Sequence, residues 1–303
     1  MPVPQFQDIT LPLLRLAADG QTYSLAGARD RLADTFGLTE SEREELLPSG
    51  RQARFANRVA WAKVYLEQAG LVTSPARGKF VIAPRGLDVL KDPPDRISIK
   101  FLERFPEFAT FRARGQRAAP TTSVDAASAE ETETPEETLE AAYQQIRGGL
   151  AAQLLERVKA APPRFFEQLV VELLLKMGYG SARKGAGEAI GKAGDEGIDG
   201  IINEDRLGLD RVYLQAKRWD GTVGRPEIQR FVGALHGKRA RKGVFITTSS
   251  FSPEAISFVE TIDPRVVLID GEQLAEFMID FDIGVTEERS YQLKRIDSDF
   301  FDA

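Results

Sequence analysis

Two neighbouring stretches, GDEGIDGII at residues 194–202 and DRVYLQAKRW at residues 210–219, decide the fold of the second half of this 303-residue chain. Side chains alternate between the two faces of a strand, so the second stretch has one small apolar face and one polar face. The apolar face holds Val212, Leu214 and Ala216, and the other holds Tyr213, Gln215 and Lys217. Asp199 begins the apolar run of the first stretch. If the two strands pair as a hairpin, Asp199 lies close to Gln215 and Lys217.

A carboxylate, an amide and an ammonium group gathered in this way suit the hydrolysis of a phosphodiester. A carboxylate holds a divalent cation, which neutralises charge and makes its bound water more acidic. A lysine beside it orients or deprotonates that water and offsets charge at the phosphate. Mg²⁺ retains several waters and fits one aspartate plus amide or main-chain oxygens, and Mn²⁺ is an alternative. The competing interpretation is a solvated strand face without catalytic function.

Strands alternate with helices through residues 136–303, which predicts an α/β domain with a mixed sheet flanked by helices. A Gly-rich, strand-forming region spans residues 178–219. The helices are expected at residues 136–160, 164–178, 226–237, 253–260 and 271–279, and the later strands at residues 243–248 and 265–269.

Residues 1–113 predict a smaller, mainly helical domain. Helical spacing of apolar residues covers 8–19, 24–37 and 51–69, and Ser24 is the expected N-cap of the second helix. Two short strands, 71–73 and 79–83, follow around a turn. Three helices followed by a basic hairpin are typical of a winged helix, a helix-turn-helix variant that binds DNA.

Several side chains of this domain are candidates for DNA contact. They are Arg51, Arg54, Asn57 and Arg58 on the third helix, and Arg77 and Lys79 on the hairpin. In a winged helix the third helix enters the major groove and the hairpin touches the backbone, and an asparagine pairs with adenine. A solvated basic face is the alternative, and the same choice is open for the cluster Lys238, Arg239, Arg241 and Lys242.

Composition limits the remaining possibilities. Residues 114–135 are rich in Ala, Thr, Ser and Glu, which predicts a flexible linker between the two domains. The chain has no cysteine and only His236, which argues against disulfides, zinc sites and a Ser-His-Asp triad. No apolar run approaches the roughly 18 residues of a membrane span, and no secretory signal is evident. We therefore expect a soluble cytoplasmic protein without a membrane partner.

Taken together, these motifs resemble the Mrr branch of the PD-(D/E)xK nucleases. The resemblance is carried by Phe166-Glu167 on an apolar helix, the Asp195–Gly200 run and Gln215-Ala-Lys217. It covers about residues 163–260 and the closing YQLKRIDSDFF, and the opening LPLLRLAADG is similar to the Mrr N-terminal domain. In this branch glutamine replaces the second acidic ligand of the wider superfamily.

The resemblance implies a role for each matching residue. Asp199, Gln215 and the main chain of Ala216 would bind the metal, Lys217 would be the catalytic lysine, and Glu167 would complete the site. The implied activity is type IV restriction, in which foreign double-stranded DNA is cut, often only when methylated. Because a double-strand cut needs two active sites, we expect a dimer or larger homo-oligomer during cutting.

Two other functions stay open at this point. The neutral side chain of Gln215 weakens metal binding, so the chain could be a DNA-binding sensor whose nuclease fold is weakly active or inactive. The same fold also serves DNA repair and junction resolution, and a fold does not determine a function.

Overall fold

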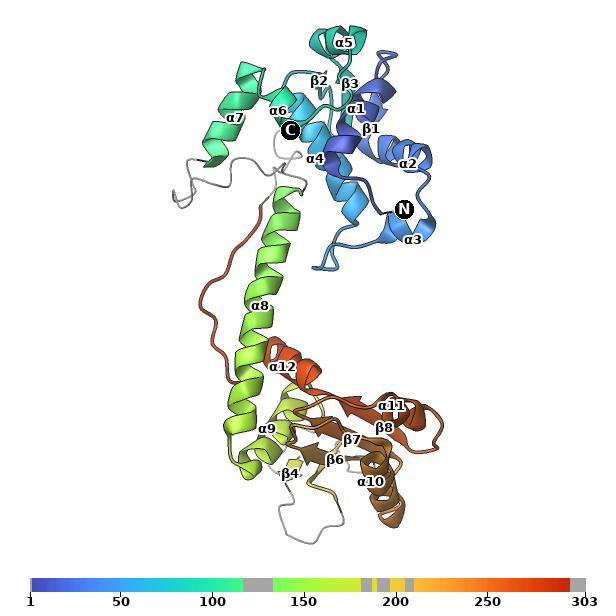
Figure 1. Ribbon diagram of the computed structural model, residues 1–303, viewed down its shortest axis with the longest axis vertical. Coiled ribbons are helices and arrows are strands. Elements are labelled where there is room, and N and C mark those ends of the chain that lie inside the picture. Colours follow the sequence, from blue (N-terminus) through green and yellow to red (C-terminus); the bar gives the residue numbers. More distant parts are fainter. Residues whose placement is uncertain (1, 117–132, 181–186, 190–196, 205–209, 295–303) are drawn as a thin grey trace. The chain divides into compact units, whose positions relative to one another are not determined.

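The computed structural model describes residues 2–116, 133–180, 187–189, 197–204 and 210–294 (Figure 1). They form two compact units, an N-terminal unit that ends at Gln145 and a C-terminal unit that spans Ile146–Leu293. The division falls within the long helix α8 (Pro135–Ala160). The predicted linker, residues 114–135, lies mostly outside the described residues, and its first residues continue helix α7. None of the described helices is long and apolar enough to cross a membrane.

The N-terminal unit combines short helices with a three-stranded antiparallel sheet in the order β1-β3-β2. Its elements are α1 (Phe6–Leu16), β1 (Tyr23–Ser24), α2 (Leu25–Thr35), α3 (Glu40–Glu44), α4 (Arg54–Gln68), β2 (Val72–Thr73), β3 (Lys79–Ile82), α5 (Pro84–Lys91), α6 (Ile99–Leu102), α7 (Pro106–Gln116) and the start of α8. The predicted helices and hairpin are present, and the Ser24 side chain accepts the N–H of Gly27 as an N-cap. Helices α3, α5, α6 and α7 were not predicted.

Helix α4 contributes the central part of this unit's core. The four residues that share its predicted apolar face are all buried: Phe55, Val59, Ala62 and Leu66. They belong to the same cluster as Leu13 of α1 and Phe80 of β3. The helical spacing therefore identified correctly which side of α4 faces inward.

The C-terminal unit is built on a five-stranded mixed sheet in the order β4-β5-β6-β7-β8 (Figure 1). The strands β4, β5 and β6 pair antiparallel, whereas β6, β7 and β8 pair parallel. Their bounds are β4 (Gly187–Ala189), β5 (Gly200–Asn203), β6 (Arg211–Lys217), β7 (Lys242–Thr247) and β8 (Arg265–Ile269). This topology confirms the expectation of a mixed sheet with parallel segments.

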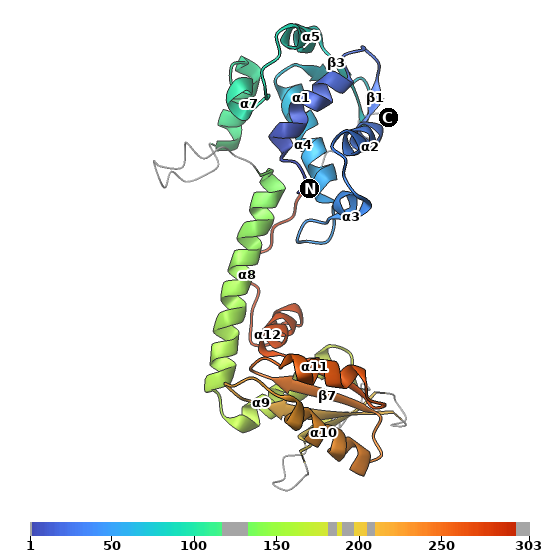
Figure 2. The ribbon, with the colours of Figure 1, turned by 45° about the vertical axis from the view of Figure 1, so that its right-hand side comes forward.

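Helices cover both faces of this sheet (Figure 2). On one face the end of α8, α9 (Pro163–Lys176) and α12 (Gly271–Asp280) pack against residues such as Leu214. On the other, α10 (Arg225–Gly237) and α11 (Pro253–Glu260) pack with Tyr213 and Phe245. Tyr213 is thus buried although it lies on the face of β6 expected to be polar. That face is exposed at Arg211, at the start of the strand, and partly exposed at Gln215 and Lys217, at its end.

Candidate active site

The β5–β6 hairpin places Asp199 beside the end of β6, as the sequence predicts. Gly200 is the partner of Leu214 across the hairpin, and the N–H of Asp199 donates to the Leu214 carbonyl oxygen over 2.8 Å. Asp199 Oδ2 accepts hydrogen bonds from Gln215 Nε2 and, over 2.8 Å, from the main-chain N–H of Ala216. The strand register therefore joins two motifs that are 16 residues apart in the chain.

Gly197 allows this close approach. Its φ of +89° lies in the left-handed region that side chains other than glycine rarely adopt. A Cβ atom at this position would also lie 3.1 Å from Gln215 Oε1. A glycine here lets the chain turn into Asp199 while the Gln215 amide lies against it.

Lys217 projects from the same face of β6 as Gln215, two residues further on. Its Nζ lies 2.5 Å from Oε2 of Glu227 on α10 and 4.5 Å from the ring centroid of Trp219. Burial raises the pKa of Asp199, and the positive charge of Lys217 is among the influences that oppose this shift, so the two side chains interact electrostatically.

Helix α9 brings Glu167 to the same place. Phe166 is buried and anchors the helix, and the adjacent Glu167 is partly exposed. Burial raises the pKa of Glu167, and the negative charge of Asp199 raises it further. Asp199 and Gln215 are therefore in direct contact, Lys217 follows on the same face of β6, and Glu167 lies within electrostatic range of Asp199.

The electrostatics of the cluster favour a bound cation. Burial raises the pKa of Asp199 above its ordinary range, although the hydrogen bonds from Ala216 and Gln215 oppose this shift. A divalent cation held by the Asp199 carboxylate would reverse the effect. The oxygen atoms of the Asp199 and Glu167 carboxylates and of the Gln215 amide are hard ligands of the kind that Mg²⁺ and Mn²⁺ prefer. Within the described ranges no three His, Cys, Asp or Glu side chains form a group that could hold a metal ion.

Two residues near the site were not anticipated from the sequence. Glu227, in the first turn of α10, binds Lys217, and Trp219 places its ring beside the same ammonium group. No local spacing links a helix residue to a lysine on a preceding strand. The only available signal was that Trp219 follows Lys217 by two positions.

The polar side of α4 differs from the open DNA-reading face that the sequence predicts. Asn57 is 2% exposed, and its Oδ1 accepts a hydrogen bond of 2.6 Å from Thr134 Oγ1, just before α8. Arg54 pairs with Glu45, with Nη1 and Oε1 2.6 Å apart. The start of α8 occupies the position where we expected DNA.

Arg58 is also engaged inside the N-terminal unit. Its side chain is 11% exposed and its Nη2 lies 2.8 Å from Oε1 of Glu137, itself 8% exposed. The Nη1 of Arg58 donates to the main-chain oxygens of Val3 and Pro4. Arg58 therefore holds the start of α8 and the N-terminal segment together.

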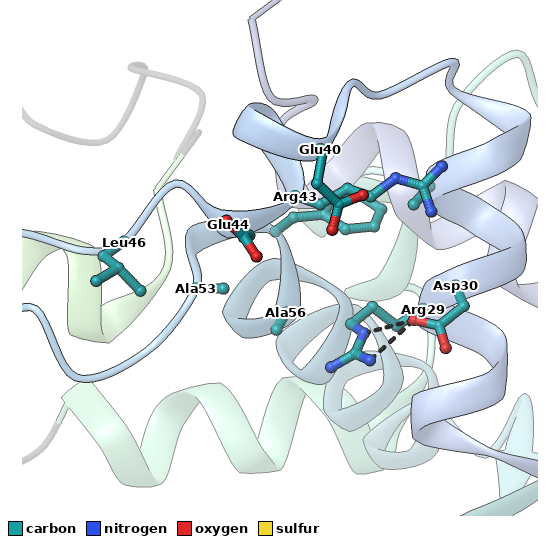
Figure 3. Close-up of a pocket in the computed structure, with 10 residues that line it drawn as sticks. Arg29, Asp30, Glu40, Arg43, Glu44, Leu46, Ala53 and Ala56 are labelled. Carbon is teal, nitrogen blue, oxygen red and sulfur yellow. Dashed lines mark hydrogen bonds and ion pairs between the residues drawn. The ribbon is translucent and has the colours of Figure 1, made fainter.

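Other basic candidates are accessible. Arg51, before α4, and Arg77 and Lys79, on the β2–β3 hairpin, are exposed. A hollow beside the start of α4 carries both signs of charge, including the ion pair of Arg29 with Asp30 (Figure 3). Asp195 lies outside the described residues, and so do Arg183, Lys184 and Lys192, for which the sequence leaves open the choice between DNA contact and a solvated surface.

Comparison with known proteins agrees with this geometry. A family model described as restriction endonuclease matches residues 158–278, and the Mrr N-terminal domain matches residues 6–92. The type IV methyl-directed restriction enzyme EcoKMrr of Escherichia coli (strain K12) is 36% identical over 308 residues, which cover 100% of both chains. The chain belongs to the Mrr family of restriction endonucleases. This membership confirms the expectation of a DNA endonuclease, and the whole candidate site lies within the matched catalytic region of the Mrr family.

Solved structures of other restriction endonucleases align more distantly with this Mrr-family chain. The DNA modification-dependent restriction endonuclease AspBHI aligns with a TM-score of 0.36 and 18% identity, over 71% of this chain and 56% of its own. Restriction endonuclease FokI aligns with a TM-score of 0.31 and 13% identity, over 91% of this chain and 70% of its own. The assignment to the Mrr family rests on the sequence match.

Proposed function

We propose that this Mrr-family endonuclease is a type IV enzyme that cuts methylated double-stranded DNA with Mg²⁺ at the cluster of Asp199, Gln215, Lys217 and Glu167. The observation that carries the proposal is the hairpin register, which bonds Asp199 to Gln215 and Ala216. The description of the E. coli relative as methyl-directed supports methylated DNA as the substrate.

The residues of the cluster divide the chemistry among them. Asp199, Gln215 and the main-chain oxygen of Ala216 would hold Mg²⁺, or Mn²⁺ in its place, and Glu167 would complete the set. A cation bound there neutralises phosphate charge and makes a coordinated water more acidic. Lys217, as an ammonium group, would orient the attacking water and offset the charge that develops at the phosphate.

The N-terminal unit would act as a winged-helix reader of DNA. The side chains of Arg51, Arg77 and Lys79, which are exposed, would contact phosphates, which supply most of the affinity of such domains. Arg54, Asn57 and Arg58 would reach DNA only if their contacts within the unit were released. Because each active site cuts one strand, cleavage of both strands requires two copies of the chain.

The direct test compares the unaltered protein with Lys217→Ala on plasmids from hosts with and without DNA methylation, in the presence of Mg²⁺. We expect the unaltered protein to cut the methylated plasmid preferentially. The variant should be at least about 100-fold slower, as is typical when a charge-stabilising group is removed, and should still bind DNA in a gel-shift assay.

Two results would contradict the proposal. Undiminished cutting by Lys217→Ala would contradict the assignment of the active site. Equal cutting of methylated and unmethylated plasmids would contradict the assignment of methylated DNA as the substrate. A four-way junction serves as a third substrate, and a clear preference for it would favour junction resolution over restriction.

A further inference from the structure

The ammonium group of Lys217 is restrained before any substrate is present. Its Nζ forms an ion pair of 2.5 Å with Glu227 Oε2 and lies 4.5 Å from the centroid of the Trp219 ring. The second carboxylate oxygen of Glu227, Oε1, accepts a hydrogen bond of 2.6 Å from Arg230. The Glu227 side chain is only 15% exposed, whereas that of Arg230 is 76% exposed. Glu227 is thus a largely covered carboxylate with two partners. One is the partly exposed Lys217, and the other is the solvent-exposed Arg230.

The position of Glu227 is determined by contacts that do not involve Lys217. Helix α10 has Pro226 at its start, and Glu227 lies in the first turn, where the helix dipole favours a carboxylate. The next residue, Ile228, is fully buried, and Phe231 is 1% exposed and packs against Phe245 of β7. The core of the unit therefore holds the carboxylate in place, and the flexible lysine adapts to it.

On the basis of the proposed function, we propose that Glu227 is a positioning residue for Lys217. Lysine has a long flexible side chain, and fixing it in one conformation costs conformational entropy. If the side chain becomes ordered only in the transition state, this cost raises the activation barrier. The ion pair with Glu227, with the Trp219 ring beside it, orders the ammonium group in advance at the end of β6, within electrostatic reach of Asp199. Glu227 touches neither the substrate nor the cation in this proposal and acts only through Lys217.

The test measures single-turnover cleavage by Glu227→Gln, with Arg230→Gln as the matched control. We expect Glu227→Gln to lower the maximal rate by about 10- to 100-fold, the range for a misplaced reacting group. The DNA concentration and the Mg²⁺ concentration for half-maximal rate should stay unchanged, and the variant should remain folded at the assay temperature. Arg230→Gln should stay within about twofold of the unaltered rate, because exposed ion pairs contribute little.

Each other outcome has a defined meaning when Lys217→Ala is assayed in parallel. An unaltered rate in Glu227→Gln together with an inactive Lys217→Ala would overturn the positioning role and leave the proposed site standing. A raised Mg²⁺ requirement would also overturn it, because Glu227 would then act on the cation. Unaltered rates in both Glu227→Gln and Lys217→Ala would contradict the assignment of the proposed active site itself.

A second variant protects the test against a folding defect. Glu227→Asp keeps the charge at the start of α10 and withdraws the carboxylate by one carbon. The same selective loss of maximal rate is expected, and an unaltered rate in this variant would again overturn the positioning role.

Discussion

Asp199 shows at the scale of a single residue how function and stability conflict in this protein. Its carboxylate is partly buried, and burial raises its pKa despite hydrogen bonds from Ala216 and Gln215. A buried anion without a full set of partners lowers the stability of the fold. The same property makes the position attractive for a divalent cation, so the unfavourable charge is part of the site's function.

A pH dependence follows from this shift. The native state holds the Asp199 proton more tightly than the unfolded state, in which the pKa of this carboxyl is near its ordinary value of 3.8. In metal-free protein the stabilising contribution is full below that pH and is lost as the pH rises through the higher native pKa. The free energy of unfolding, measured with urea in the presence of EDTA, should therefore fall less steeply with rising pH in Asp199→Asn than in the unaltered protein. Glu133→Gln, an exposed control, should leave the fall unchanged, and an equal fall in Asp199→Asn would contradict the pKa assignment.

Sequence reasoning identified the residues of the site to different extents. Strand alternation alone places Gln215 and Lys217 on one face of β6. Asp199 needed the additional assumption that β5 and β6 form a hairpin, which the structure bears out. The role of Glu227 could not be predicted from the sequence, because its contact with Lys217 joins a strand to a helix of another layer. That contact depends on how α10 packs against the sheet.

At the scale of elements, the strands and helices after residue 197 follow their sequence signals closely. Turn residues bound each apolar run, and β8 spans Arg265–Ile269 as predicted. Helix α4 shows the limit of this reasoning. Helical periodicity tells which side of a helix is polar, but not which part of the chain covers it. Here the covering element is the start of α8, which binds Arg58 through Glu137.

The Arg58–Glu137 pair predicts a measurable contribution to the stability of the N-terminal unit. Glu137→Ala leaves the covered guanidinium of Arg58 without its anionic partner, which should destabilise the unit by about 1–3 kcal/mol. Urea unfolding monitored by Trp61 fluorescence, in a Trp219→Phe background, isolates this unit because the chain has two tryptophans. The exposed control Glu133→Ala should change the stability by less than about 0.5 kcal/mol. Equal stabilities of the two variants would show that the pair contributes nothing.

At the scale of the whole molecule, the chain joins two units with separate proposed tasks, DNA reading and DNA cutting. The division within α8 was not visible in the sequence, because a continuous helical pattern marks no boundary between units. The alternation of strands and helices was sufficient for the α/β class of the cutting unit. The match to the E. coli relative covers the full length of both chains and therefore includes both units.

The most direct test of the central claim is calorimetric titration of the full chain with Mn²⁺. The proposed site predicts a single Mn²⁺ site per chain that is lost in Asp199→Asn and retained in Glu133→Gln. It further predicts that metal-dependent DNA cleavage disappears with the same substitution. Unchanged Mn²⁺ binding and cleavage in Asp199→Asn would contradict the assignment of Asp199, Gln215 and Lys217 as the nuclease site.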